Sequence, residues 1–107
     1  MSTSVRASHI LLMHADAPDT ASKRSKAAAL EAVTRLRDKI RSGDVQFAEA
    51  ARIVSECPSS EEGGDLGAFS PGMMVPEFDK AVFALSVGDM SDVVETAFGY
   101  HLILRTA

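Results

Sequence analysis

Two short apolar runs at opposite ends of the chain each carry a histidine near their start, and this pairing constrains the fold most. The first run is residues 8–14 (SHILLMH) and the second is residues 99–105 (GYHLILR). Large aliphatic residues bounded by turn-forming residues are typical of a strand. If the two runs are neighbouring central strands, His9 and His101 can meet in one sheet, where two buried imidazoles satisfy each other's hydrogen bonds. The runs alone also allow two unrelated strand histidines.

Size and composition indicate a single globular domain. At 107 residues with 46% hydrophobic residues, the chain can build a core without disulfides or metal. We expect residues 1–4 to be a flexible N-terminus and residues 5–107 to form the domain. The net charge of −4 argues against sequence-independent nucleic-acid binding. No apolar run approaches a membrane span and no signal-peptide core is seen, so we expect no membrane association. The single Cys57 cannot form an internal disulfide and fits a reducing compartment, so we expect a cytoplasmic protein. We also expect a monomer.

The segment between the two runs predicts three helices. The first begins near Thr20 or Ser22, either of which can cap it, and ends at Gly43. Its expected buried stripe is Ala29, Leu30, Val33, Leu36 and Ile40. Asp44 is expected to cap the second helix, whose apolar face is Phe47, Ala50, Ala51 and Val54. Pro76 suits the first turn of the third helix.

The remaining segments predict further strands and the fold class. Residues 66–69 form a candidate short strand followed by a turn at 70–72, and residues 93–96 form a β-prone stretch that turns into the last strand. The order is then strand, two helices, short strand, helix and a closing hairpin. A hairpin makes the sheet at least partly antiparallel, so the predicted class is α+β.

Four features could support chemistry. Cys57 beside two histidines raises a nucleophile hypothesis, although no motif supplies an oxyanion hole, and a buried or wall-forming thiol is the simpler interpretation. A metal site made of His9, His14, His101 and Cys57 lacks the close ligand spacing of zinc sites. The glycine-rich residues 63–67 lack the Gly-Lys-Ser/Thr ending of a phosphate loop. The fourth feature is a cluster that is either ordinary core or an apolar pocket of proline size: Leu66, Met73, Met74 and Phe78.

Five segments resemble the parvulin family of peptidyl-prolyl cis-trans isomerases, in the family's order. They are residues 7–11 (ASHIL), 55–60 (SECPSS), 64–70 (GDLGAFS), 78–85 (FDKAVFAL) and 99–105 (GYHLILR). The resemblance covers Val5 to Ala107. It implies a parvulin-like fold within the FKBP-like superfold, with a four-stranded antiparallel sheet surrounded by three to four helices. It also implies rotation about X–Pro bonds of peptide and protein clients, without cofactor or metal.

The resemblance assigns expected roles to particular residues. His9 and His101 match paired histidines of the active-site floor, and Thr96 matches a polar residue that hydrogen-bonds into their network. Cys57 matches a position that is Cys in some members and Asp in others. The residues expected to contact the substrate are Leu66, Met74, Phe78 and Phe98.

The chain differs from the phosphate-directed parvulins at several positions. Met13 stands where that subgroup has a lysine, and Phe98 where it has a serine. Its adjacent arginines are missing from residues 15–22, although Lys23 and Arg24 lie near the end of this connection and leave room for a residual phosphate preference. Recognition of a phosphoresidue needs concentrated donors. We therefore expect an isomerase that does not select phosphorylated substrates. The alternative is a proline-peptide binding module or weak chaperone whose isomerase activity is incidental.

Overall fold

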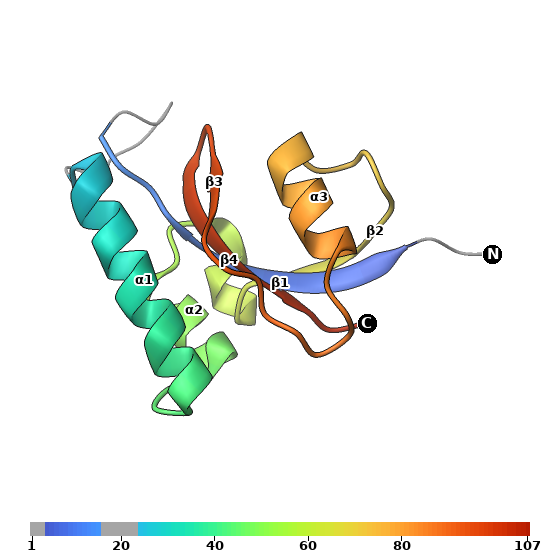
Figure 1. The fold of residues 1–107 in the computed structure, drawn as a ribbon. Coiled ribbons are helices and arrows are strands. Elements are labelled where there is room, and N and C mark those ends of the chain that lie inside the picture. Colours follow the sequence, from blue (N-terminus) through green and yellow to red (C-terminus); the bar gives the residue numbers. More distant parts are fainter. Residues whose placement is uncertain (1–3, 16–23) are drawn as a thin grey trace.

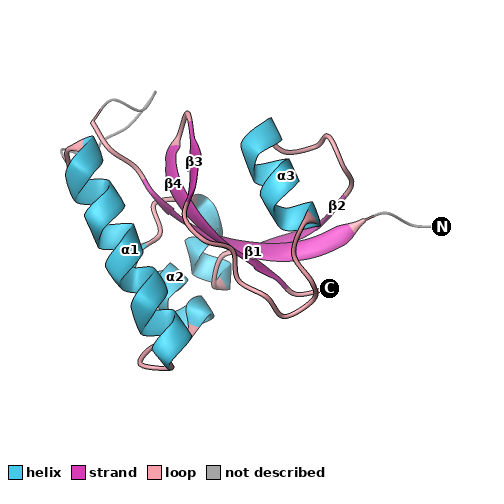
Figure 2. Ribbon diagram, in the orientation of Figure 1, coloured by secondary structure: helices cyan, strands magenta, loops and turns pink. Residues whose placement is uncertain are grey.

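A single antiparallel sheet organises the computed structural model, which describes residues 4–15 and 24–107. Its strands are β1 (Val5–Leu12), β2 (Asp65–Phe69), β3 (Val94–Thr96) and β4 (Gly99–Arg105). They lie in the order β2-β1-β4-β3 (Figures 1 and 2). The two histidine-bearing runs are therefore neighbouring central strands, and the α+β class with a four-stranded antiparallel sheet is confirmed. β1 begins at Val5, three residues before the run recognised in the sequence.

The helices lie on both faces of this sheet. α1 (Lys26–Ser42) and α2 (Phe47–Val54) pack on one face, and α3 (Pro76–Phe83) packs on the other (Figure 1). A short 3-10 helix, η1 (Pro58–Glu62), follows α2 and is absent from the sequence-based prediction. None of the described helices is long and apolar enough to span a membrane.

Three sequence-based details of the first two helices are wrong. Ser25 caps α1, because its Oγ accepts a hydrogen bond from the Ala28 N–H at 3.1 Å. The expected caps Thr20 and Ser22 lie outside the described residues, as do residues 1–3 of the N-terminus. Asp44 does not cap α2, which starts after Gln46 with no side-chain cap. Leu30 is 41% exposed, because the buried stripe of α1 passes through Ala29 and Val33 instead.

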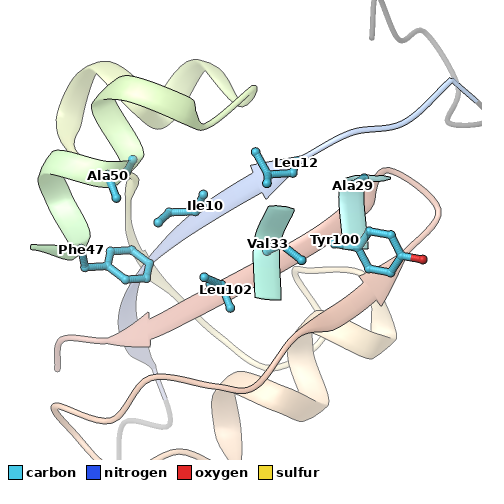
Figure 3. Packing of buried hydrophobic residues seen from close by; sticks show 9 residues of the cluster. Ile10, Leu12, Ala29, Val33, Phe47, Ala50, Tyr100 and Leu102 are labelled. Carbon is cyan, nitrogen blue, oxygen red and sulfur yellow. The ribbon is translucent and has the colours of Figure 1, made fainter. Parts of the chain in front are cut away.

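The sheet separates two hydrophobic clusters. Between the sheet and α1–α2 lie Ile10, Leu12, Ala29, Val33, Phe47, Ala50, Ala51, Tyr100 and Leu102 (Figure 3). On the opposite face, α3 packs on a second cluster: Val5, Ala7, Phe69, Phe78, Val82 and Ile103. Successive side chains of a strand point to opposite faces, so the clusters share strands but not side chains. The histidine pair lies on the α3 side, beside Phe78.

Candidate active site

The register between β1 and β4 brings the two histidines together. His9 pairs with Ile103 and Leu11 pairs with His101, so the imidazoles are diagonal neighbours on one face. Their Nδ1 atoms lie 3.1 Å apart and the rings stack at a centroid distance of 5.3 Å. The expected hydrogen-bonded pair is therefore confirmed, and the interpretation as unrelated histidines is wrong.

Hydrogen bonding defines the protonation of this pair. Thr96 Oγ1 lies 2.7 Å from His101 Nε2, so both ring nitrogens of His101 have partners, whereas His9 Nε2 has none among the described residues. A buried N–H without a partner is rarer than an acceptor without one. This favours donation from His9 Nδ1–H to His101 Nδ1, and from His101 Nε2–H to Thr96 Oγ1. The expected link between Thr96 and the histidines is thus present.

Both imidazoles are held neutral. Burial lowers the pKa of His9 to about 4. Burial, followed by repulsion from His9, lowers the pKa of His101 to about 3. Each neutral ring carries one N–H and one lone pair, so a neutral pair can form the Nδ1–Nδ1 bond, whereas a doubly protonated pair has no acceptor for it. At neutral pH this floor therefore carries no charge.

A pocket of about 170 Å³ opens above the histidines. Phe78 forms one side of this pocket. Its ring stands nearly perpendicular to both imidazole rings, with centroid distances of 5.6 Å. The complete lining is His9, Cys57, Leu66, Met74, Val75, Phe78, Phe98 and His101. The lining contains no Asp, Glu, Lys or Arg side chain, so the pocket suits a small apolar group.

The pocket is assembled from elements far apart in the sequence. Leu66 comes from β2, Phe78 from α3, and Met74 from the connection between them. Phe98 comes from the β3–β4 turn and remains 44% exposed, which places it at the pocket's rim. Met73, which the sequence grouped with this pocket, is 67% exposed and does not line it. Its sulfur instead accepts from the Ser70 N–H, so the chain turns its side chain outward.

Cys57 faces the pocket without a histidine partner. Its sulfur accepts a hydrogen bond from Ser59 Oγ at 3.2 Å, and among the described residues no histidine is hydrogen-bonded to it. A nucleophilic cysteine requires a base within hydrogen-bond reach, so the geometry argues against the Cys–His nucleophile.

Within residues 4–15 and 24–107, no group of three or more His, Cys, Asp or Glu side chains could hold a metal ion.

The segment that carries Cys57 is tied along β1. Ser55 Oγ accepts from the Leu11 N–H at 3.1 Å, and the His9 N–H donates to Gly64 O at 2.9 Å. Gly64 has φ +87°, and a Cβ there would lie 2.3 Å from His9 O. Only glycine allows this approach without displacing the backbone. These supports, together with Val75 in the lining, are missing from the sequence-based site, because they depend on contacts between distant segments.

Comparisons with known proteins show the family to which this chain is similar. A family model described as a rotamase, the PPIC-type PPIase domain, matches residues 9–107. The chain is 42% identical over 113 residues to a peptidyl-prolyl cis-trans isomerase Pin1 of Arabidopsis thaliana, covering 96% of this chain and 95% of that protein. It is also 42% identical to a chaperone SurA of Polaromonas, of which it spans only 20%.

A solved structure has the same fold. The peptidyl-prolyl isomerase ESS1 from Candida albicans superposes with a TM-score of 0.93 at 36% identity. The match covers 98% of this chain and 63% of that one, so this chain spans just under two thirds of the ESS1 chain.

Proposed function

We propose a mechanism and a substrate range for this chain, which belongs to the parvulin (PPIC-type rotamase) family of peptidyl-prolyl cis-trans isomerases. The chain is a peptidyl-prolyl cis-trans isomerase that acts on X–Pro bonds. The observation that carries the mechanism is an apolar pocket of about 170 Å³ above two neutral, mutually bonded histidines. In the proposal, Leu66, Met74 and Phe78 hold the proline ring while the acyl side rotates.

The mechanism needs no bond cleavage. The X–Pro amide resists rotation with a barrier of about 18–20 kcal/mol because resonance keeps it planar. The twisted amide is less dipolar than the planar one, so replacing water by an uncharged, apolar lining favours the twisted form. Lowering the barrier by about 5 kcal/mol accelerates rotation by a factor on the order of 10⁴. His9 and His101 shape the floor, and Cys57 adjusts its polarity without attacking the substrate.

The pocket assignment is tested at Phe78. Phe78→Leu keeps an apolar side chain in the buried position but withdraws the ring from the pocket. We expect the KM for an Ala-Pro peptide to rise with kcat less affected, in an NMR exchange or protease-coupled assay. Phe78→Ala should raise KM further but costs about 3–5 kcal/mol of stability. An unchanged KM in a folded Phe78→Leu variant contradicts the pocket assignment.

We further propose that the enzyme does not select phosphorylated substrates. The pocket lining contains no Lys or Arg, and position 13, where the phosphate-directed parvulins have a lysine, is a methionine in this chain. Arg24 does not line the pocket either, and Lys23 lies outside the described residues. A phosphate dianion needs several charge-assisted donors. Turnover of Glu-Pro, Leu-Pro and phosphoSer-Pro peptides tests this: comparable values are expected, and a strong preference for the phosphopeptide overturns the proposal.

A second candidate function is a proline-peptide binding module or chaperone. Its support is the exposure of Met73 and Phe98 beside the pocket, together with the similarity to a protein named chaperone SurA. The same peptide assay distinguishes the two functions. Accelerated exchange at catalytic enzyme concentrations favours the isomerase as the main activity. Saturable binding with little acceleration favours the module.

A further inference from the structure

A second hollow lies on the α1–α2 side of the sheet, away from the histidine pocket. It measures about 270 Å³ and its apolar part consists of Leu12, Ala32, Leu36 and Val54. Leu12 is buried at the end of β1, whereas Val54 at the end of α2 is 37% exposed. His9 and Leu12 differ by an odd number of positions along β1, so their side chains point to opposite faces. The hollow is therefore a separate feature from the active-site pocket.

The charged part of this hollow is entirely cationic. Arg24, Arg35 and Lys39 line it, and no acidic residue does. Along α1, the lining residues Ala32, Arg35, Leu36 and Lys39 follow the spacing i, i+3, i+4 and i+7, which forms one continuous helix face. We call the hollow with these residues the basic groove. It is distinctive in a chain whose net charge is −4.

The ion pairs of the groove leave its cations able to change partner. Arg35 pairs with Glu31 one helical turn away, and both side chains are largely exposed. Arg24 pairs with Glu56 at 3.4 Å, a long contact between half-exposed groups. Exposed pairs of this kind contribute about 0–1 kcal/mol, so an incoming carboxylate can replace them at low cost. Lys39 forms no ion pair with any described residue.

We propose that the basic groove binds an acidic, aliphatic segment of a polypeptide client. The cationic side chains of the groove bind the carboxylates of this segment. The apolar residues of the groove contact one leucine-sized side chain that lies between two of these carboxylates. Drug-sized sites begin at about 300 Å³, so the groove, at about 270 Å³, can hold one side chain but not a folded domain. A client bound here through such a segment raises the local concentration of its X–Pro bonds at the other face. The groove thus selects clients by sequence outside the bond that is isomerised.

The test uses the full chain and a short proline-free peptide of alternating Glu and Leu, with its Gln analogue as the neutral control. ¹⁵N-resolved NMR titration should show shifts at Ala32, Leu36 and Val54 but not at Phe78. Replacing both groove cations of α1, in R35Q/K39Q, should weaken binding at least about tenfold, since each lost charge-assisted hydrogen bond contributes more than a neutral one. The affinity of the parent chain for the Gln peptide should be no higher than the affinity of R35Q/K39Q for the acidic peptide.

A charge-matched variant separates the groove from general electrostatics. R41Q/R52Q removes the same charge from exposed positions of α1 and α2 that do not line the groove. It should bind the acidic peptide as the parent chain does, and all variants should isomerise a short Ala-Pro peptide at the parent rate. Equal weakening by both double variants, or shifts outside the groove, overturns the proposal. So does tighter binding of anionic phosphatidylglycerol vesicles than of the peptide at these residues, which would make the groove a lipid-headgroup site.

Discussion

At the scale of single residues, the histidine pair is defined by what burial does to its protonation. The ordinary histidine pKa is about 6.5, and burial lowers that of His9 to about 4 and that of His101 to about 3. As the pH falls below 6.5, the unfolded chain therefore binds protons that the folded chain excludes. The contribution of the pair to stability is complete above that pH and is lost as the pH falls toward about 4.

This loss of stability at low pH can be measured. The free energy of unfolding in urea should decrease between pH 7 and pH 5, before the carboxyl groups with lowered pKa, such as Asp65 and Asp92, titrate. Over the same range kcat/KM should stay level, because the folded pair remains neutral. NMR of the imidazole rings gives a direct check. Ring signals of His9 and His101 that titrate near pH 6.5 in the folded protein would contradict the neutral pair.

A second prediction concerns Cys57. Because its sulfur is bonded to Ser59 and to no described histidine, it lacks the base that a nucleophile needs. Cys57→Ala and Cys57→Asp should each retain substantial kcat/KM on an Ala-Pro peptide, with losses of roughly tenfold or less. Catalysis through a covalent intermediate predicts near-total loss in both variants. Mass spectrometry during turnover should likewise detect no adduct on the enzyme.

At the scale of elements, the site depends on how closely η1 and β2 approach β1. Gly64, in the connection between η1 and β2, lies against the backbone of His9 in β1. Its φ is +87°, and a Cβ at this position would clash with His9 O. Gly64→Ala should destabilise the fold by more than about 2 kcal/mol and lower kcat/KM, since backbone strain adds to the displacement of β1. Gly72→Ala is the matched control, because Gly72 has the same φ but open space around it. Equal effects of the two substitutions in thermal unfolding would show that the close contact is unimportant.

The elements also show how far the sequence could predict the molecule. Alternation, apolar runs and turn residues predict β1, β4 and the closing hairpin, and a known family pattern identifies His9, His101 and the pocket residues. Local patterns could not predict that Ser25 caps α1 or that α2 starts without a side-chain cap. Thr20, Ser22 and Asp44 are equally good caps in isolation. Gly64 and Val75 escaped prediction because their roles depend on packing between distant segments.

At the scale of the whole molecule, the sheet divides supporting and reacting faces. One face is filled by α1 and α2 and carries the basic groove, and the other holds α3 with the histidine pocket. Because β1 and β4 belong to both faces, loss of either cluster should unfold the same cooperative unit. Only the α3 side, however, positions side chains that contact the proposed proline ring. Shortening a buried side chain in either cluster should therefore lower the free energy of unfolding. Only a change in the cluster on the α3 side should also weaken substrate binding.

Two valines offer the matched experiment for this separation. Val33 on α1 and Val82 on α3 are both fully buried, one in each cluster. Val33→Ala and Val82→Ala should each cost about 2 kcal/mol in denaturant unfolding, through lost burial and a residual cavity. Only Val82→Ala should also raise the KM for an Ala-Pro peptide below the melting temperature, because Val82 lies one helical turn after Phe78 and holds α3 against the sheet. An equal rise in KM from Val33→Ala would mean that the sheet transmits packing defects between its faces, and that the pocket depends on both clusters.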